Sequence, residues 1–207
     1  MQMPLFSSPN DTPHAVPVEL EGAEVTYFPQ WLTPAESSSM ITALKAELPW
    51  RQDTIKLFGK PVKIPRLQAW HGDPECRYQY SGLALTPAAW TPTLNTLRQS
   101  LQSQLNHPFN SVLANWYRDG NDSMALHADD EPELGDRPVI ASVTLGEARP
   151  FVFRHRRTKK RTVLPLANGS VLIMAGDTQS NYLHGIAKTA KPVSDRINLT
   201  FRYVYPQ

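Results

Sequence analysis

Residues 138–155 read PVIASVTLGEARPFVFRH and contain two apolar runs with Gly146 between them. β-Branched and aromatic side chains dominate both runs, which favours β-strands. Comparable stretches are FNSVLANWYRDG, which ends in an Asp-Gly turn signal, then RTVLPLANGSVLIMAG, and finally RINLTFRYVY with period-two alternation. Seven or eight short strands separated by turns predict a β-sandwich or double-sheet barrel over residues 109–207.

The N-terminal half has helical patterns instead. Thr33-Pro34 precedes apolar residues at helical spacing, and Glu36 completes a capping box, so we expect a helix over 33–48. A second Thr-Pro pair predicts another helix over 91–105. Residues 49–90 are expected to form short strands and loops, after a strand-like stretch at 18–32.

The predicted fold class is therefore α+β, with helices first and a β core after them. Four prolines among small polar residues predict a flexible tail at the N-terminus. The expected organisation is a tail at 1–17, an N-terminal extension at 18–108 and the β core at 109–207.

Composition excludes several classes of protein. Of 207 residues, 41% are apolar and 19% are charged, which is ordinary for a globular domain. The net charge of +2 is too small to attract polyanions, so such binding would need a local basic patch. Cys76 is the single cysteine, which rules out an intrachain disulfide. No apolar run is long enough to span a bilayer, and the first residues do not resemble a secretory signal.

The segment HADDE at 127–131 is a candidate for half of a metal site. In an extended segment His127 and Asp129 point to the same side and can reach one ion, although three adjacent acids also suit a solvated turn. His184, just beyond an apolar strand, is the best second histidine, and a hydrogen-bonded histidine at a strand end is its alternative. Two histidines and one carboxylate form the facial triad of non-heme Fe(II) oxygenases.

The C-terminal strand RINLTFR at 196–202 places two arginines on one face and apolar residues on the other. If Arg196 and Arg202 face the core, a dianion or paired acids must neutralise them. A dicarboxylate that chelates iron at one end would satisfy both guanidiniums through charge-assisted hydrogen bonds. A salt-bridged outer face is the alternative.

Together, His127-x-Asp129, His184 and RINLTFR resemble the AlkB family of Fe(II)/2-oxoglutarate-dependent dioxygenases, most closely the branch that repairs double-stranded DNA. The resemblance covers about residues 50–205 and includes NWYRDG, IASVTLG, FVFRH and LPLANGSVLIM. It implies a double-stranded β-helix (jelly-roll) core with a nucleotide-recognition lid at about 50–90. It also implies Fe(II), the co-substrate 2-oxoglutarate and O2.

The resemblance implies a role for each motif. His127, Asp129 and His184 would bind the metal. The expected 2-oxoglutarate ligands are Arg196 at the distal carboxylate with Tyr117 and Asn198, Arg202 and Asn115 towards the iron, and Thr200 on the same face. The reaction is oxidative dealkylation of N-alkylated bases in DNA (1-methyladenine and 3-methylcytosine type), in which 2-oxoglutarate is decarboxylated to succinate and formaldehyde is released.

Further residues are expected to contact the nucleic acid. The base pocket would contain Tyr78, Tyr80, Ser81 and Glu131, with lid packing as the alternative for the tyrosines. The Leu57-Phe58-Gly59 segment, in a lysine-rich hairpin, would hold open the gap left by a flipped base, unless Phe58 folds back onto the lid. Arg66 would steady the DNA. The run RHRRTKKR at 154–161 suits phosphate contacts or a solvated loop, and its expected DNA ligands are Arg156, Arg157, Lys159 and Lys160.

Three other functions remain as alternatives. An oxygenase could act on RNA. It could also act on a protein or a small metabolite, and neither of these two substrates would need the basic run. A catalytically inactive jelly-roll binding module would show a broken triad, and a zinc hydrolase would leave the two arginines unexplained. We expect a monomer that binds double- and single-stranded DNA and no membrane, in a bacterial cytoplasm or, in a eukaryote, the nucleus.

Overall fold

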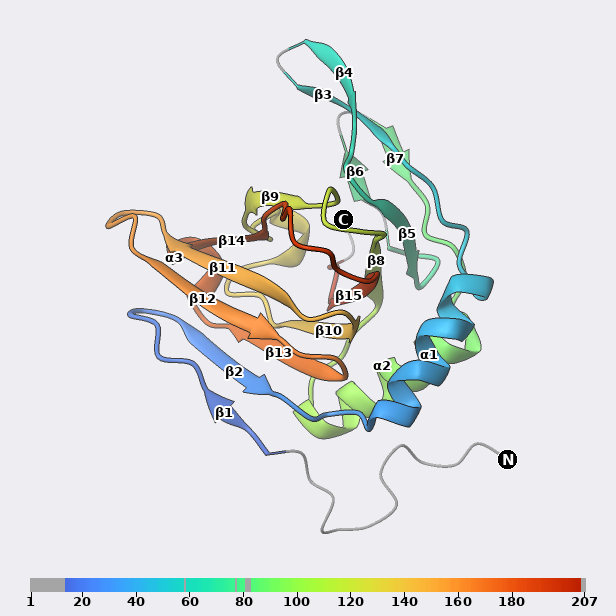
Figure 1. Ribbon diagram of the computed structural model, residues 1–207, viewed down its shortest axis with the longest axis horizontal. Coiled ribbons are helices and arrows are strands. Elements are labelled where there is room, and N and C mark those ends of the chain that lie inside the picture. The colour runs from blue at the N-terminus through green and yellow to red at the C-terminus, as the bar shows by residue number, and fades with distance from the viewer. Residues whose placement is uncertain (1–13, 58, 77, 81–82, 206–207) are drawn as a thin grey trace.

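The computed structural model describes residues 14–57, 59–76, 78–80 and 83–205 (Figure 1). Two antiparallel sheets pack face to face. The larger sheet has the order β1 (Val16–Pro17), β2 (Glu24–Phe28), β13 (Ser170–Ala175), β10 (Ile140–Gly146), β15 (Arg196–Arg202), β8 (Ser111–Tyr117), β5 (Leu67–Gly72). The smaller sheet has the order β12 (Arg161–Leu166), β11 (Arg149–His155), β14 (Tyr182–Ile186), β9 (Met124–His127). This arrangement confirms the jelly-roll core.

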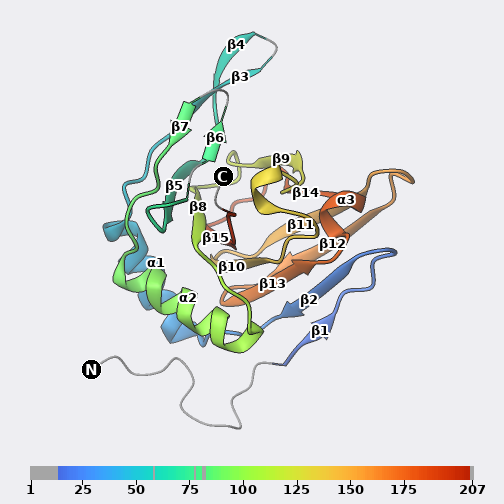
Figure 2. The ribbon, with the colours of Figure 1, turned by 180° about the vertical axis from the view of Figure 1, so that it is seen from behind.

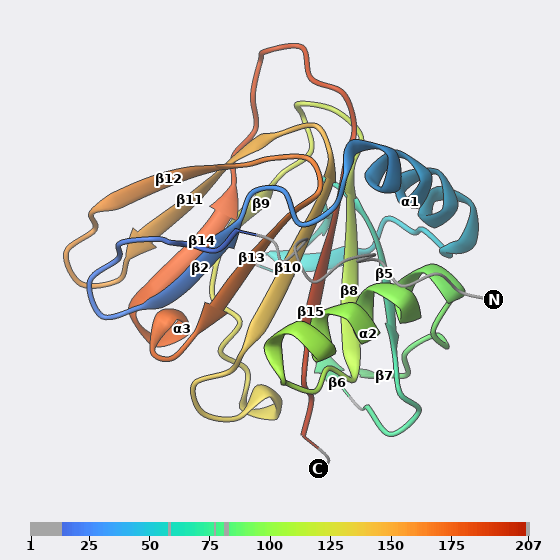
Figure 3. The same cartoon turned by 90° about the horizontal axis from the view of Figure 1, so that it is seen from below.

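Both predicted helices are present. α1 (Pro34–Glu47) begins after Thr33, and the hydroxyl of Thr33 and the carboxylate of Glu36 form the expected capping box. α2 (Pro92–Leu105) begins after Thr91, whose hydroxyl accepts a hydrogen bond from the backbone of Leu94. The two helices cover one face of the larger sheet, and the smaller sheet covers the other (Figure 3). No helix among the described residues is long and apolar enough to cross a membrane.

The N-terminal extension is part of the sheet rather than a separate layer. β2 pairs with β13, and β5 pairs with β8, so the predicted boundary at residue 109 does not separate two units. The predicted flexible tail is also too long, because Val16–Pro17 forms β1 and pairs with β2. Strand pairing supplies hydrogen-bond partners to backbone groups that an edge would leave exposed. Residues 1–13 of the predicted tail lie outside the described residues.

β15 shows how the larger sheet serves two purposes. Ile197, Leu199 and Phe201 lie in the fully buried apolar cluster beneath the helices. The alternate residues of the strand, beginning with Arg196, face the smaller sheet. A single strand therefore anchors the core and carries polar side chains into the space between the sheets.

Two hairpins extend from the larger sheet at the lid expected near residues 50–90. They are β3 (Thr54–Leu57) with β4 (Lys60–Lys63), and β6 (Tyr78–Tyr80) with β7 (Leu83–Leu85). Seen from both sides, the β3–β4 hairpin projects away from the sheets, and the β11–β12 turn lies on the other side of β9 and β14 (Figures 1 and 2). The remaining short elements are α3 (Thr178–Asn181) and the 3-10 helix Pro132–Leu134.

Candidate metal and co-substrate site

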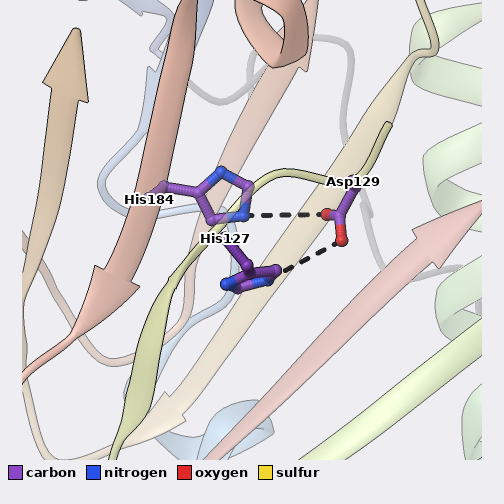
Figure 4. A group of neighbouring side chains, drawn as sticks. All are labelled: His127, Asp129 and His184. Carbon is purple, nitrogen blue, oxygen red and sulfur yellow. Dashed lines mark ion pairs between the residues drawn. The ribbon is translucent and has the colours of Figure 1, made fainter. Parts of the chain in front are cut away.

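Two neighbouring strands bring the predicted metal ligands together. His127 ends β9 and is the register partner of His184 on β14, and Asp129 follows two residues after His127. One carboxylate oxygen of Asp129 lies 3.7 Å from Nε2 of His127, and the other lies 3.7 Å from Nε2 of His184 (Figure 4). When one ligand atom is taken from each residue, the three atoms all lie within 4.8 Å of one another. The structure therefore forms the cluster that the sequence predicted.

The geometry and chemistry of this cluster fit Fe(II). Distances of 3.7 Å are too long for hydrogen bonds between the three side chains. Oδ2 of Asp129 is buried and has no hydrogen-bond partner among the described residues. Two imidazole nitrogens and a carboxylate oxygen are the donor set of non-heme Fe(II) oxygenases. These three residues would hold the metal and leave its remaining positions open.

Burial and nearby charges keep both buried ligands in the form that binds a metal. Burial lowers the pKa of His184 to about 3, against the opposing effect of Asp129, so the imidazole is neutral at pH 7. Burial alone would raise the pKa of Asp129, but Arg202 and the two histidines outweigh burial and hold that pKa below its usual value. A neutral imidazole and an ionised carboxylate each offer a lone pair.

Surrounding contacts orient the ligands. Nδ1 of His127 lies 2.9 Å from the carbonyl of Ala125, which directs Nε2 towards Asp129. A guanidinium nitrogen of Arg202 donates to Asp129 at 2.6 Å, and the backbone N–H of Asp129 donates to the side chain of Gln179 at 3.1 Å. The ring of Phe151 stacks on His184 with 5.3 Å between centroids. Arg202 thus lies at the metal end of the arginine strand, where it was expected.

Arg196 lies at the other end of the strand and is fully buried. Its Nη2 donates to the hydroxyl of Thr144 at 2.9 Å, whereas Nε and Nη1 are buried without a hydrogen-bond partner among the described residues. Burial lowers the pKa of Arg196 to about 10, with Tyr117 acting in the opposite direction, so the guanidinium stays charged at neutral pH. Two unpaired donors on a buried cation fit a carboxylate of the co-substrate.

The other expected co-substrate residues line the same face. The amide of Asn198 donates to Ser142 and to the carbonyl of Val143, and the hydroxyl of Thr200 donates to Oδ1 of Asn198. Tyr117 and Asn115 on β8 are the register partners of Arg196 and Asn198. The guanidinium carbon of Arg196 lies 5.3 Å from the centroid of the Tyr117 ring. This polar face could hold a dicarboxylate between the metal cluster and Arg196.

Arg66 lies closer to this face than the sequence suggested. Its Nε donates to Oδ1 of Asn115 at 2.8 Å, and Nη1 lies 3.4 Å from the carbonyl of Ser123. Hydrogen bonds therefore hold the Arg66 side chain beside the co-substrate residues. A contact between Arg66 and DNA stays a prediction.

The structure describes only part of the predicted base pocket. Tyr78 and Tyr80 lie in β6, and Ser81 falls outside the described residues. Glu131 immediately precedes the 3-10 helix, two residues after Asp129. Its Oε2 is buried and has no hydrogen-bond partner among the described residues.

The basic run forms the predicted hairpin between β11 and β12, where Arg154 pairs with Arg161. Arg157, Lys159 and Lys160 are exposed in its turn. Arg156 differs from them, because its guanidinium forms an ion pair with Asp130 beside the metal ligand. The basic turn is thereby tied to the segment that carries the metal cluster.

Two residues of the predicted wedge, Leu57 and Gly59, lie at the end of the β3–β4 hairpin. Leu57 ends β3, Phe58 is outside the described residues, and Gly59 has a φ of 79°, a conformation that suits glycine. Lys56, Lys60 and Lys63 are exposed on the hairpin.

Sequence patterns missed three residues that support the site. Gln179 and Phe151 contact metal ligands, and Arg149 is a buried arginine whose guanidinium binds backbone carbonyls of two loops. The burial of Arg149 could have been predicted from the sequence, because Arg149 shares a strand face with Phe151 and Phe153. Cys76 has no such role, since burial raises the pKa of its thiol to about 11.

Comparison with known proteins agrees with this geometry. The family model of the 2OG-Fe(II) oxygenase superfamily matches residues 24–202. The chain is 37% identical over 194 residues to mouse alpha-ketoglutarate-dependent dioxygenase alkB homolog 3, covering 89% of this chain and 67% of the relative. It is 40% identical over 160 residues to the mouse DNA oxidative demethylase ALKBH2, covering 73% of this chain and 67% of the relative.

A solved structure extends the agreement to the fold. The structure of OsALKBH1 superposes with a TM-score of 0.61 at 18% identity, covering 89% of this chain and 99% of the other. The segment matched by the family model includes the metal cluster and the arginine strand. The chain belongs to the AlkB family within the 2OG-Fe(II) oxygenase superfamily, and is a dioxygenase that uses Fe(II), 2-oxoglutarate and O2.

Proposed function

We propose that this dioxygenase repairs N-alkylated bases of the 1-methyladenine and 3-methylcytosine type in DNA. Bound Fe(II) with 2-oxoglutarate and O2 would supply the oxidation of the N-linked methyl group, with succinate, CO2, formaldehyde and the repaired base as products. The relatives named as an alkB homolog and as a DNA oxidative demethylase support this class of reaction.

The observation that carries the proposal is the carboxylate of Glu131. It lies two residues from Asp129, and one of its oxygens is buried without a hydrogen-bond partner among the described residues. A buried acceptor is costly unless a ligand satisfies it. Adenine and cytosine both carry an exocyclic amino group that can donate to the Glu131 oxygen. Methylation that gives 1-methyladenine or 3-methylcytosine also makes the base cationic. A negative acceptor beside the metal therefore suits these lesions.

The basic surfaces support a nucleic acid over a protein or metabolite. The β11–β12 turn and the β3–β4 hairpin lie on either side of the strands that carry the histidines (Figure 2), and both contain exposed cations. Cations at these two places can contact phosphates while a base enters between them. This arrangement suits both double- and single-stranded DNA as partners.

The test uses matched oligonucleotides that contain one 1-methyladenine or one 3-methylcytosine, as single-stranded DNA, duplex DNA and single-stranded RNA. Repaired base and formaldehyde are measured together with succinate formed in the absence of nucleic acid. We expect formaldehyde and repaired base in equal amounts from DNA. Succinate formation without repair of any DNA oligonucleotide would place the substrate elsewhere, and repair of RNA alone would favour the RNA alternative.

A variant pair then tests the role of Glu131. Glu131→Gln keeps the size of the side chain and removes its charge, so we expect a loss of about tenfold or more in kcat/KM for the cationic bases. Succinate formation without nucleic acid should be unchanged. Glu133→Gln, in the adjoining 3-10 helix, is the matched control and should behave like the parent. Equal repair by both variants would remove Glu131 from the base pocket.

A further inference from the structure

Arg149 is a buried cation outside the residues assigned to the co-substrate so far. It begins β11, is 1% exposed and forms no ion pair among the described residues. Its Nη1 donates to the carbonyl of Asp119 at 3.2 Å, and its Nη2 donates to the carbonyls of Asp122 at 3.3 Å and Ala187 at 2.7 Å. A buried guanidinium that binds only backbone carbonyls has no ion-pair partner to neutralise its charge.

The three carbonyls belong to two loops that adjoin the co-substrate residues. The loop at 118–123 starts directly after Tyr117, and the loop at 187–195 ends directly before Arg196. The loops also contact each other, because the N–H of Thr189 donates to the carbonyl of Gly120 at 2.9 Å. A Cβ at Gly120 would lie 2.3 Å from the Thr189 oxygen, so the loops are closely packed. Arg149 therefore connects the segments that place Tyr117 and Arg196.

The charged side chains around Tyr117 and Arg196 include more cations than free carboxylates. Arg149 and Arg196 both act on Tyr117, where their charges oppose the rise in pKa caused by burial. Asp122 is the nearby acid, and both of its oxygens bind the guanidinium of Arg118, at 2.8 and 3.0 Å. Among the described residues, neither Arg149 nor Arg196 has a carboxylate at ion-pair distance. Asp122 also feels the charge of Arg149, but its oxygens are bonded to Arg118, so two buried cations with no carboxylate at ion-pair distance favour an anionic ligand.

We infer that Arg149 is a positioning residue of the co-substrate site. Its hydrogen bonds join the two loops that adjoin Tyr117 and Arg196, and its charge, rather than the packing of these loops, favours a ligand that carries a carboxylate at the Arg196 end. The inference rests on the 2-oxoglutarate site and not on the nucleic acid proposed as substrate.

The test is an anaerobic titration of the Fe(II)-loaded protein with two probes. One is 2-oxoglutarate, and the other is 2-oxopentanoate, which has the same chain length but a methyl group in place of the distal carboxylate. The readout is the ratio of the two dissociation constants, which a general loosening of the fold would not change. For Arg149→Met we expect the preference for 2-oxoglutarate to fall about tenfold or more, since a buried charge acts strongly at short range.

Two further variants separate charge from packing. Arg149→Lys keeps the charge and should keep the preference within about threefold of the parent value. Gly120→Ala disturbs the contact between the loops without changing any charge, and should weaken both probes alike. If Arg149→Met does not fold, Arg149→Gln is measured in the same way, because its amide NH2 group is neutral and can still donate to the loop carbonyls.

An unchanged preference in the folded neutral variant, whatever its absolute affinities, would overturn the inference. The inference is also overturned if Gly120→Ala lowers the preference for 2-oxoglutarate over 2-oxopentanoate as much as loss of the Arg149 charge does. A parent protein that fails to bind 2-oxoglutarate would instead contradict the co-substrate site itself. Nucleic acid is absent from the titration, so failure of the proposed substrate cannot produce either result.

Discussion

Replacing Arg196 by Met should stabilise the protein without 2-oxoglutarate and weaken its binding of that co-substrate. Arg196 is fully buried, and its Nε and Nη1 have no hydrogen-bond partner among the described residues. Each unmet buried donor costs about 1–3 kcal/mol, whereas the lost bond to Thr144 contributed about 1 kcal/mol. For the two unmet donors together, the net expected gain in the free energy of unfolding is about 1–5 kcal/mol. At this chain length, each kcal/mol corresponds to about 2–4 °C in Tm.

The same substitution removes the partner of the distal carboxylate. Loss of a buried charge-assisted contact costs about 2–5 kcal/mol of binding, which weakens 2-oxoglutarate at least about 30-fold. At a concentration about 100 times the parent Kd, the ligand stabilises the parent by about 2.7 kcal/mol. The variant would gain less than about 0.9 kcal/mol under the same conditions.

Anaerobic scanning calorimetry of the Fe(II)-loaded protein, with and without 2-oxoglutarate, measures both effects. Arg161→Met is the matched control, since Arg161 is an exposed arginine on strand β12 and should change stability by less than about 0.5 kcal/mol. A variant that is less stable than the parent in the absence of ligand would refute the argument that Arg196 is an unpaired buried cation. An undiminished ligand-dependent rise in Tm would refute its role at the carboxylate.

Three further predictions concern the metal, the basic turn and the wedge. His184→Ala should abolish succinate formation while near-UV circular dichroism shows a native fold, and continued turnover would contradict the metal assignment. Replacing the exposed cations of the β11–β12 turn by Gln should make DNA binding less dependent on salt. The slope of log K against log salt concentration should fall by about 0.9 for each duplex phosphate that is no longer neutralised. Lys188→Gln serves as the control, and an unchanged slope in the turn variant would mean a solvated loop. The residues replaced are Arg157, Lys159 and Lys160. Phe58→Ala should lose most repair of duplex DNA and keep most repair of single strands, and equal losses would indicate a packing role instead.

Local rules explain why much of the fold could be predicted from the sequence. The capping box at Thr33 and Glu36 determines where α1 begins, because its hydrogen bonds span only three residues. The alternation in β15 predicts which side chains share a face whatever the strand pairs with. The grouping of His127 with Asp129 is likewise local, since residues two apart on an extended segment point to the same side.

Contacts between distant segments could not be predicted in the same way. Nothing in the residues around Val16 indicates that it pairs with β2, and the predicted tail was therefore too long. The ion pair between Arg156 and Asp130, and the hydrogen bond from Arg66 to Asn115, each join side chains from separate elements. Such contacts depend on how two sheets and their loops are placed against each other.

Periodicity, capping and residue chemistry were thus enough to predict a double-sheet core, the helix starts, the candidate metal ligands and the arginine face of β15. The positions of His184 beside His127, of Arg202 against Asp129, and of Arg149 between the loops that adjoin Tyr117 and Arg196 are instead products of the assembled sheets. A buried charge is stable only where distant segments supply its partners, and strand register decides which segments meet.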